Sequence, residues 1–258
     1  MNQWITLFQK EQLEMIRNFK WIWVPMVFIL LGVQEPLTLY YMPKILDFVG
    51  GLPEGAVFQM PVPSAEEVLA ASQGQYNTLG ILIIALTSMG IIAGERKSGV
   101  AGLILVKPIS YTSFITAKWA GAMLLLWVSY FIGYVASWYY VVILFENIPF
   151  ADFFQSYAVN GIWLSFVLTV SVFFNSFFRS PGVVGFITIV SVIILSLISS
   201  TFIKWLEWSP SLLSTYTTTF IINQHFPKET LPTVIVSLVG MVALLVGSIT
   251  ILRKKELV

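Results

Sequence analysis

Long apolar stretches alternate with short polar or charged stretches along this chain. Six apolar stretches are long enough to cross a membrane as helices, since a helix rises about 1.5 Å per residue and the hydrocarbon core is about 30 Å thick. The pattern therefore predicts an all-α integral membrane protein, a single transmembrane domain over residues 1–258. The six predicted spans are residues 21–41, 76–93, 115–145, 157–178, 183–203 and 232–252.

The segment before the first span is patterned rather than uniformly apolar. Apolar side chains such as Trp4, Phe8 and Met15 fall on one side of a helix, and polar ones such as Lys10 fall on the other. We predict an amphipathic helix over residues 1–20 that lies in the membrane interface, not a cleavable signal. The alternative is a soluble amphipathic helix packed on a domain, but no soluble domain follows.

Three consecutive charges, Glu95, Arg96 and Lys97, end the second apolar stretch. Each would cost about 2.5 to 3.5 kcal/mol at the centre of a bilayer, so the chain must return to water here. Gly99 then permits a turn. We predict that residues 94–114 form a cytoplasmic connector between the second and third spans.

The middle of this connector is apolar but short. Residues 100–106 cannot span a bilayer, and Pro108 cannot continue a helix that precedes it, so a short helix on the membrane surface is predicted. Ser110 or Thr112 can cap the next helix. Lys118 lies near the point where that helix enters lipid.

Two outer segments differ in character. Residues 42–75 are rich in proline and glycine, and they end in a short polar helix that begins at Ser64, where Glu67 completes a capping-box pattern. Residues 204–231 mix apolar residues with serine and threonine, and their tryptophans suit the headgroup region. The second segment predicts a short extracellular helical element, re-entrant or interfacial, before the sixth span.

Composition agrees with a membrane protein and excludes several chemistries. The 258 residues are 57% hydrophobic and 10% charged, against about 25% charged in soluble domains. The net charge of +1 gives no indication of a nucleic-acid partner. The absence of cysteine excludes thiolate sites, and the single histidine, His225, makes a histidine metal site improbable.

Basic residues predict the orientation. With the N-terminus inside, eleven lysines and arginines fall in cytoplasmic segments, and only Lys44, Lys204 and Lys228 fall outside. Both termini are therefore predicted to be cytoplasmic, in a multi-pass protein of the cell membrane. A polar turn between the fourth and fifth spans carries Arg179 and a Pro-Gly break, and we expect Arg179, Pro181 and Gly182 to form a second cytoplasmic contact.

Candidates for a substrate pathway are weaker. Glu35 near the outer end of the first span is a functional suspect, but it lies merely at the interface if the helix ends at Pro36, which is the interpretation we favour. Trp127 and Tyr134 belong to an aromatic stripe that could line a route, although such stripes usually face lipid or neighbouring helices. Small residues four apart, as at Gly133, permit close helix packing within the subunit.

This plan resembles the membrane subunit of an ATP-binding-cassette (ABC) exporter of the ABC type-2 permease class. The resemblance is most specific in the connector, whose matching positions are Glu95, Arg96, Lys97, Gly99, Leu103, Leu105, Pro108, Ser110 and Lys118. It implies that the connector is a coupling helix seated on an ATPase subunit. It also implies two copies of that ABC ATPase and a second permease chain, identical or paralogous.

The residues themselves agree that ATP is handled elsewhere. No phosphate loop of the form G-x-x-x-x-G-K-S/T occurs in the chain, so ATP and Mg²⁺ are expected on the partner ATPase, with no cofactor bound here and no catalytic residue. Two alternatives remain open: a secondary transporter or channel, which would more often show mid-span charges or repeats, and, less favoured, an intramembrane enzyme. The transported compound cannot be identified from the sequence.

Overall fold

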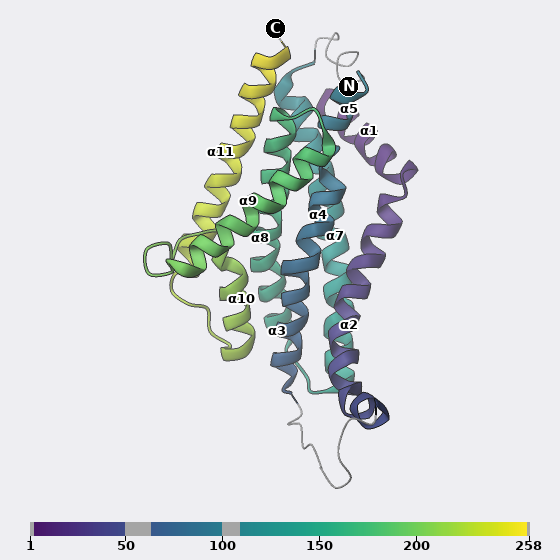
Figure 1. Ribbon diagram of the computed structural model, residues 1–258, viewed down its shortest axis with the longest axis vertical. Coiled ribbons are helices and arrows are strands. Elements are labelled where there is room, and N and C mark those ends of the chain that lie inside the picture. The colour runs from purple at the N-terminus through teal and green to yellow at the C-terminus, as the bar shows by residue number, and fades with distance from the viewer. Residues whose placement is uncertain (1–2, 50–62, 100–108, 257–258) are drawn as a thin grey trace.

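The protein is a bundle of long helices, several of which run along the long axis of the molecule (Figure 1). The computed structural model describes residues 3–49, 63–99 and 109–256. In chain order the helices are α1 (Gln3–Arg17), α2 (Lys20–Val49), α3 (Ala65–Gln75), the π-helical turn η1 (Tyr76–Gly80), α4 (Ile81–Ser88), α5 (Ala93–Lys97), α7 (Tyr111–Leu144), α8 (Phe150–Phe177), α9 (Pro181–Thr201), α10 (Leu212–Asn223) and α11 (Thr230–Glu256).

Within the described residues, six helices are long and apolar enough to cross a membrane, which confirms the predicted number of spans. They cover Lys20–Ile45, Ala65–Lys97, Tyr111–Leu144, Phe150–Phe177, Pro181–Thr201 and Thr230–Lys255. The protein is therefore a multi-pass membrane protein. The start of α1 and the end of α11 lie at the same end of the bundle (Figure 1).

The first span does not end where the sequence analysis expected. α2 continues through Pro36 and Pro43 to Val49, because a transmembrane helix tolerates proline when neighbouring helices support the freed backbone. Pro36 is buried. The helix does not end at Pro36, so the condition on which Glu35 was placed at the outer interface does not hold. Glu35 lies inside the candidate span Lys20–Ile45.

The second span is longer than predicted, and part of the outer loop 42–75 belongs to it. α3, η1 and α4 follow one another without a break. α3 is too polar for the apolar criterion, and two of its polar side chains, Ser72 and Gln73, are buried in protein. Its predicted start is confirmed. The Glu67 amide donates to Ser64 Oγ at 3.2 Å, and the Ser64 amide donates to Glu67 Oε2 at 3.0 Å.

The other predicted limits need smaller corrections. α8 begins at Phe150 instead of residue 157, and Asp152 in its first turn complements the helix dipole. α7, α9 and α11 have limits within four residues of those predicted. α10 lies inside the segment 204–231 where a helical element was expected, and α1 lies inside residues 1–20.

Backbone contact between α2 and α7 organises one side of the bundle. A Cβ atom placed on Gly133 of α7 would lie 2.5 Å from the carbonyl oxygen of Phe28 in α2. A Cβ atom on Gly32 would meet the Gly133 carbonyl oxygen at 2.3 Å. Only glycine allows this approach, so the predicted packing role of Gly133 is confirmed.

Candidate functional site

Four charged side chains from three helices meet at the connector end of the bundle. Lys118 of α7 places its Nζ atom 2.8 Å from Glu11 Oε1 of α1 and 2.9 Å from Glu95 Oε1 of α5. Lys10 of α1 contacts the same Glu95 oxygen and lies 3.2 Å from Glu11 Oε1. We call Lys10, Glu11, Glu95 and Lys118 the ionic cluster. It joins both ends of the connector to the N-terminal helix.

The packing of α1 against α7 brings Glu11 to this position. Trp4 Nε1 donates to Thr116 Oγ1 at 3.0 Å, which fixes one turn of α1 against α7. Gly121, one turn beyond Lys118, leaves room for α1, since a Cβ atom there would lie 3.3 Å from the Glu11 Cβ. The glycine therefore lets the Glu11 carboxylate reach Lys118.

The ionic cluster is largely removed from solvent. Lys118, Glu11 and Glu95 are only 2%, 5% and 8% exposed. Burial of Lys10 by itself lowers its pKa, but the hydrogen bond with Glu95 and the charges of Glu11 and Glu95 outweigh it, so the pKa is raised above 10.5. Lys10 therefore stays charged as a partner of the carboxylates.

The acidic members also have the spacing of a cation site, with Glu14 as a third carboxylate. The oxygens of Glu11, Glu14 and Glu95 lie within 4.8 Å of one another. Two ammonium groups already contact these carboxylates, and Lys10 Nζ lies 3.5 Å from Glu14 Oε2. The arrangement is thus a set of ion pairs within the protein.

A second polar contact holds the break between α4 and α5. The side-chain oxygen of Asn175 in α8 accepts hydrogen bonds from the amides of Ile92 and Ala93, at 3.2 and 3.0 Å. Its amide nitrogen donates to the carbonyl oxygens of Ser88 and Ser171, at 3.0 and 2.9 Å. One buried side chain therefore satisfies backbone groups on both sides of the break and anchors α5 to α8.

The remaining connector residues lie around these contacts. Arg96 Nη1 donates to the Ser176 carbonyl oxygen at 3.1 Å, and Lys97 is exposed. Gly99 has a φ of +79°, which confirms the predicted glycine turn. Of the two candidate caps, Ser110 begins α7, with the Ser113 amide donating to its Oγ at 3.1 Å.

Several predicted positions are not described by the structure. Leu103, Leu105 and Pro108, with the short surface helix expected over residues 100–106, lie outside the described residues.

The predicted second contact lies in the turn from α8 to α9. Arg179 and Gly182 are exposed, and Pro181 is the first residue of α9. The hydrogen bond from Arg96 to Ser176 places the end of α8 beside α5. The structure thus brings the beginning of the connector close to the helix end from which the α8–α9 turn departs.

The pathway candidates do not form one site. Tyr134 is fully buried, and its hydroxyl lies 2.8 Å from Ser156 Oγ within an aromatic core. Trp127 Nε1 donates to Ser165 Oγ at 3.0 Å, and Glu35 accepts from Gln75 Nε2. These contacts agree with an aromatic stripe that packs against neighbouring helices rather than one that lines a route.

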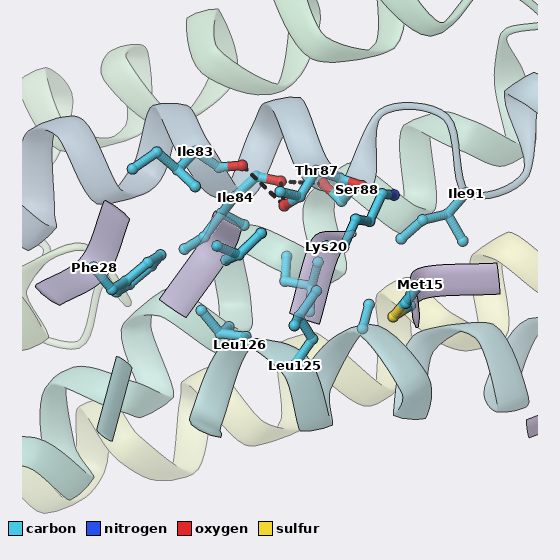
Figure 2. A pocket seen from close by; sticks show the side chains of 13 residues that line it. Met15, Lys20, Phe28, Ile83, Ile84, Thr87, Ser88, Ile91, Leu125 and Leu126 are labelled. Carbon is cyan, nitrogen blue, oxygen red and sulfur yellow. Dashed lines mark hydrogen bonds between the residues drawn. The ribbon is translucent and has the colours of Figure 1, made fainter. Parts of the chain in front are cut away.

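A small cavity of about 20 Å³ lies between α1, α2, α4, α7 and α8. Figure 2 shows apolar side chains around it, including Phe28, Leu125 and Leu126, with the Lys20 side chain alongside. Lys20 Nζ donates to the Thr87 carbonyl oxygen at 2.9 Å. The cavity has room for about one water molecule, and the lysine ties the start of α2 to the end of α4.

The sequence analysis missed Glu11 and Asn175 as site residues. For Glu11 a signal existed, because it continues the helical stripe of Trp4, Phe8 and Met15, where an apolar residue is expected. A carboxylate on that stripe predicts a buried partner. No comparable signal marks Asn175, whose contacts with Ser88, Ile92 and Ala93 join residues more than 80 positions apart.

Comparison with known proteins identifies the family of the chain. Residues 5–209 match the family described as ABC-2 family transporter protein. The chain is also 34% identical over 211 residues, 82% of each chain, to a protein of Bacillus subtilis (strain 168) described as uncharacterized transmembrane protein YxlG.

Proposed function

This chain belongs to the ABC-2 family of transporter proteins, and we propose that it is the membrane subunit of an ATP-driven exporter whose ATPase is a separate chain. The family is a membrane component of transport and not itself catalytic. The observation that carries the finer proposal is the ionic cluster, which fixes the α5 end of the connector to α1 and α7 at one end of the bundle. A connector attached in this way can transmit the movement of a docked partner to the transmembrane helices.

The proposed coupling path runs through the connector, residues 94–114, into two spans. On one side α5 is held to α8 by Asn175 and to α1 by Glu95. On the other side α7 starts at its Ser110 cap and continues for 34 residues, about 51 Å. A partner that pushes on the connector would therefore move α7 and the second span together.

The proposed assembly contains two such chains, identical or paralogous, and two ABC ATPase subunits. ATP and Mg²⁺ are bound by the ATPase, in agreement with the absence of a phosphate loop from this sequence. Arg179, Pro181 and Gly182 in the α8–α9 turn provide the second contact with the ATPase. Family membership is the support for these partners.

The test is purification of the chain from its own cells in lipid nanodiscs. We expect a P-loop ATPase to co-purify in a ratio of one to one, with vanadate-sensitive ATP hydrolysis. Gly99→Val strains the connector turn, because its φ is positive, whereas Gly94→Ala has open space for the added Cβ. The first variant should keep the ATPase but lose transport, and the second should keep both.

A different result would favour the rival class. If the purified chain contains no ATPase and moves solute across liposomes without nucleotide, it is a secondary transporter or channel. Transport at the unmodified rate by the Gly99→Val protein would remove the connector from the coupling path.

A further inference from the structure

Two surface hollows meet at one side chain, Asn77, in the π-helical turn of the second span. One hollow, of about 330 Å³, lies between η1 and α10; the other, of about 350 Å³, lies between η1, α4 and α9. Asn77 contributes to both. We call the two hollows together the Asn77 groove. π-Helical turns inside longer helices occur frequently at functional sites.

The α10 side of the groove offers hydrogen-bond acceptors. Ser214, Thr218 and Thr219 each donate their hydroxyl proton to a carbonyl oxygen of their own helix, at 2.8 to 3.1 Å. Their oxygen lone pairs remain free to accept. Asn77 Oδ1 is buried and accepts no hydrogen bond from the described part of the chain, which is costly unless a ligand or water supplies a donor.

The α9 side of the groove is mainly apolar. Its lining includes Leu79, Leu82, Val192 and Ile193, with Ser196 among them. Among the residues that the structure describes, no lysine, arginine, aspartate or glutamate lines either hollow. An ion bound here would lose its hydration without gaining a partner of opposite charge, so the lining selects against charged headgroups.

We propose that the Asn77 groove binds an uncharged amphiphile, whose hydroxyl or amide headgroup donates hydrogen bonds to Asn77 and α10 and whose aliphatic chain lies against α4 and α9. Resting on the proposed function, this is the class of compound that the protein moves. The groove lies at a distance from the ionic cluster, since Asn77 and Glu95 are separated by 18 residues of one helical span, about 27 Å.

The test uses three photoreactive probes with the same diazirine-bearing dodecyl chain, ending in a glycerol ester, a carboxylate or a trimethylammonium group. Each is irradiated with the purified chain in nanodiscs, without nucleotide or ATPase, and the labelled peptides are mapped. We expect the glycerol probe to label residues 77–82 and 189–197 at least about fivefold more than either charged probe.

Variants give the result its specificity. Asn77→Leu with Thr218→Val removes two acceptors, and labelling should fall about fivefold to tenfold. Thr201→Val is the matched control, because Thr201 makes the same bond to its own helix, 2.8 Å from the Leu197 carbonyl oxygen, but does not line the groove. Asn77→Asp should shift the preference to the trimethylammonium probe, which a misfolded protein would not show.

Equal labelling by the three probes, or labelling that persists in the double variant, would overturn the proposal. If the Thr219→Cys protein forms disulfide-linked dimers completely and no probe labels it, the groove is occupied by a second copy of the chain instead. Because labelling needs no ATPase, it is independent of the coupling proposal. If the glycerol probe labels the groove specifically but is not transported in an ATP-driven assay, the groove is a binding site for uncharged amphiphiles. The proposal that such compounds are the transported substrate would then be overturned.

Discussion

At the scale of single residues, the ionic cluster is a balance between desolvation and pairing. Each buried charge loses hydration, and its partners only partly compensate, so the intact cluster adds little to stability. Removal of one member has a larger effect because the others stay buried. Oε2 of Glu95 is already buried without a hydrogen-bond partner in the described part of the chain, so Glu95 depends on Lys10 and Lys118 at its other oxygen.

Lys118→Met tests this balance. The substitution keeps an unbranched apolar stem but leaves Glu11 and Glu95 without their most buried cation, and we expect the free energy of unfolding to fall by about 3 to 5 kcal/mol. Glu14→Gln is the control, since that carboxylate is exposed and should cost below about 1 kcal/mol. Unfolding followed by fluorescence in detergent measures both. Equal midpoints for the two variants would contradict the prediction.

The pKa of Lys10 gives an independent measurement. In the folded protein it is raised above 10.5, so the stabilisation from its charge is complete below that pH and is lost as the pH rises through the folded-state pKa. Glu95→Gln removes the carboxylate charge while Lys10 stays half-buried, and the pKa of Lys10 should fall. Carbon-13 NMR of methylated lysines follows it, with Lys10→Arg assigning the signal. Glu14→Gln should lower the pKa of Lys10 by less than Glu95→Gln does, because the Glu14 carboxylate is exposed and its charge is screened by solvent.

The sequence indicated two members of the ionic cluster but not which residues they contact. Glu95 was predicted as a connector residue because charge ends an apolar stretch. Lys118 was expected near the point where the next helix enters lipid, and the family resemblance added it to the coupling residues. The pairing with Glu11 could not be deduced from spacing, because Glu11 and Lys118 are 107 positions apart and meet only through the packing of α1 on α7. The available indication was the position of Glu11 on the apolar side of α1, which predicts a buried partner but does not identify it.

At the scale of helices, hydropathy predicted each span but not each helix end. A span is set by the apolar length that lipid requires, whereas a helix continues as long as its backbone is satisfied. α2 therefore passes Pro36, and α3 extends the second span with side chains that are buried in protein, such as Gln73. Tertiary contacts, which a local pattern does not contain, decide these ends.

Close approach of α2 and α7 can be tested with one methyl group. Gly133→Ala would place a Cβ atom 2.5 Å from the Phe28 carbonyl oxygen, so the helices must separate, and we expect a loss of about 1 to 3 kcal/mol in thermal unfolding. Gly74→Ala in α3 has nothing within 4 Å and should stabilise by about 0.4 to 1 kcal/mol. If Gly133→Ala and Gly74→Ala destabilise the protein by similar amounts, the effect at Gly133 does not come from the close approach of α2 and α7.

At the scale of the whole molecule, two functions are assigned to separate parts of the second span. The ionic cluster holds its α5 end to α1 and α7, and the Asn77 groove lies 18 residues away along the same span, roughly 27 Å. Movement of the connector would therefore reach the groove through α5 and α4, whose break is held by the hydrogen bonds of Asn175. This coupling requires that the connector face the compartment that contains the ATPase.

That orientation is the last prediction, and the chain suits its test because it contains no cysteine. Ser98 and Ser180 are exposed on the turns that follow α5 and α8, and Asn147 is exposed on the turn between α7 and α8. In intact cells, Asn147→Cys should react with a membrane-impermeant maleimide, whereas Ser98→Cys and Ser180→Cys should react only after permeabilisation. The physical reason is that eleven basic residues lie on the connector side of the membrane and three on the other side, and segments rich in lysine and arginine stay in the cytoplasm.

Permeabilised cells provide the control, since all three cysteines must react there. Reaction of Ser98→Cys in intact cells would place the connector outside, where no cytoplasmic ATPase could reach it. The ionic cluster would then stabilise the bundle without serving coupling. If Ser98→Cys is protected in intact cells and Asn147→Cys reacts, the connector lies in the cytoplasm. That is the side from which ATP hydrolysis can move α7.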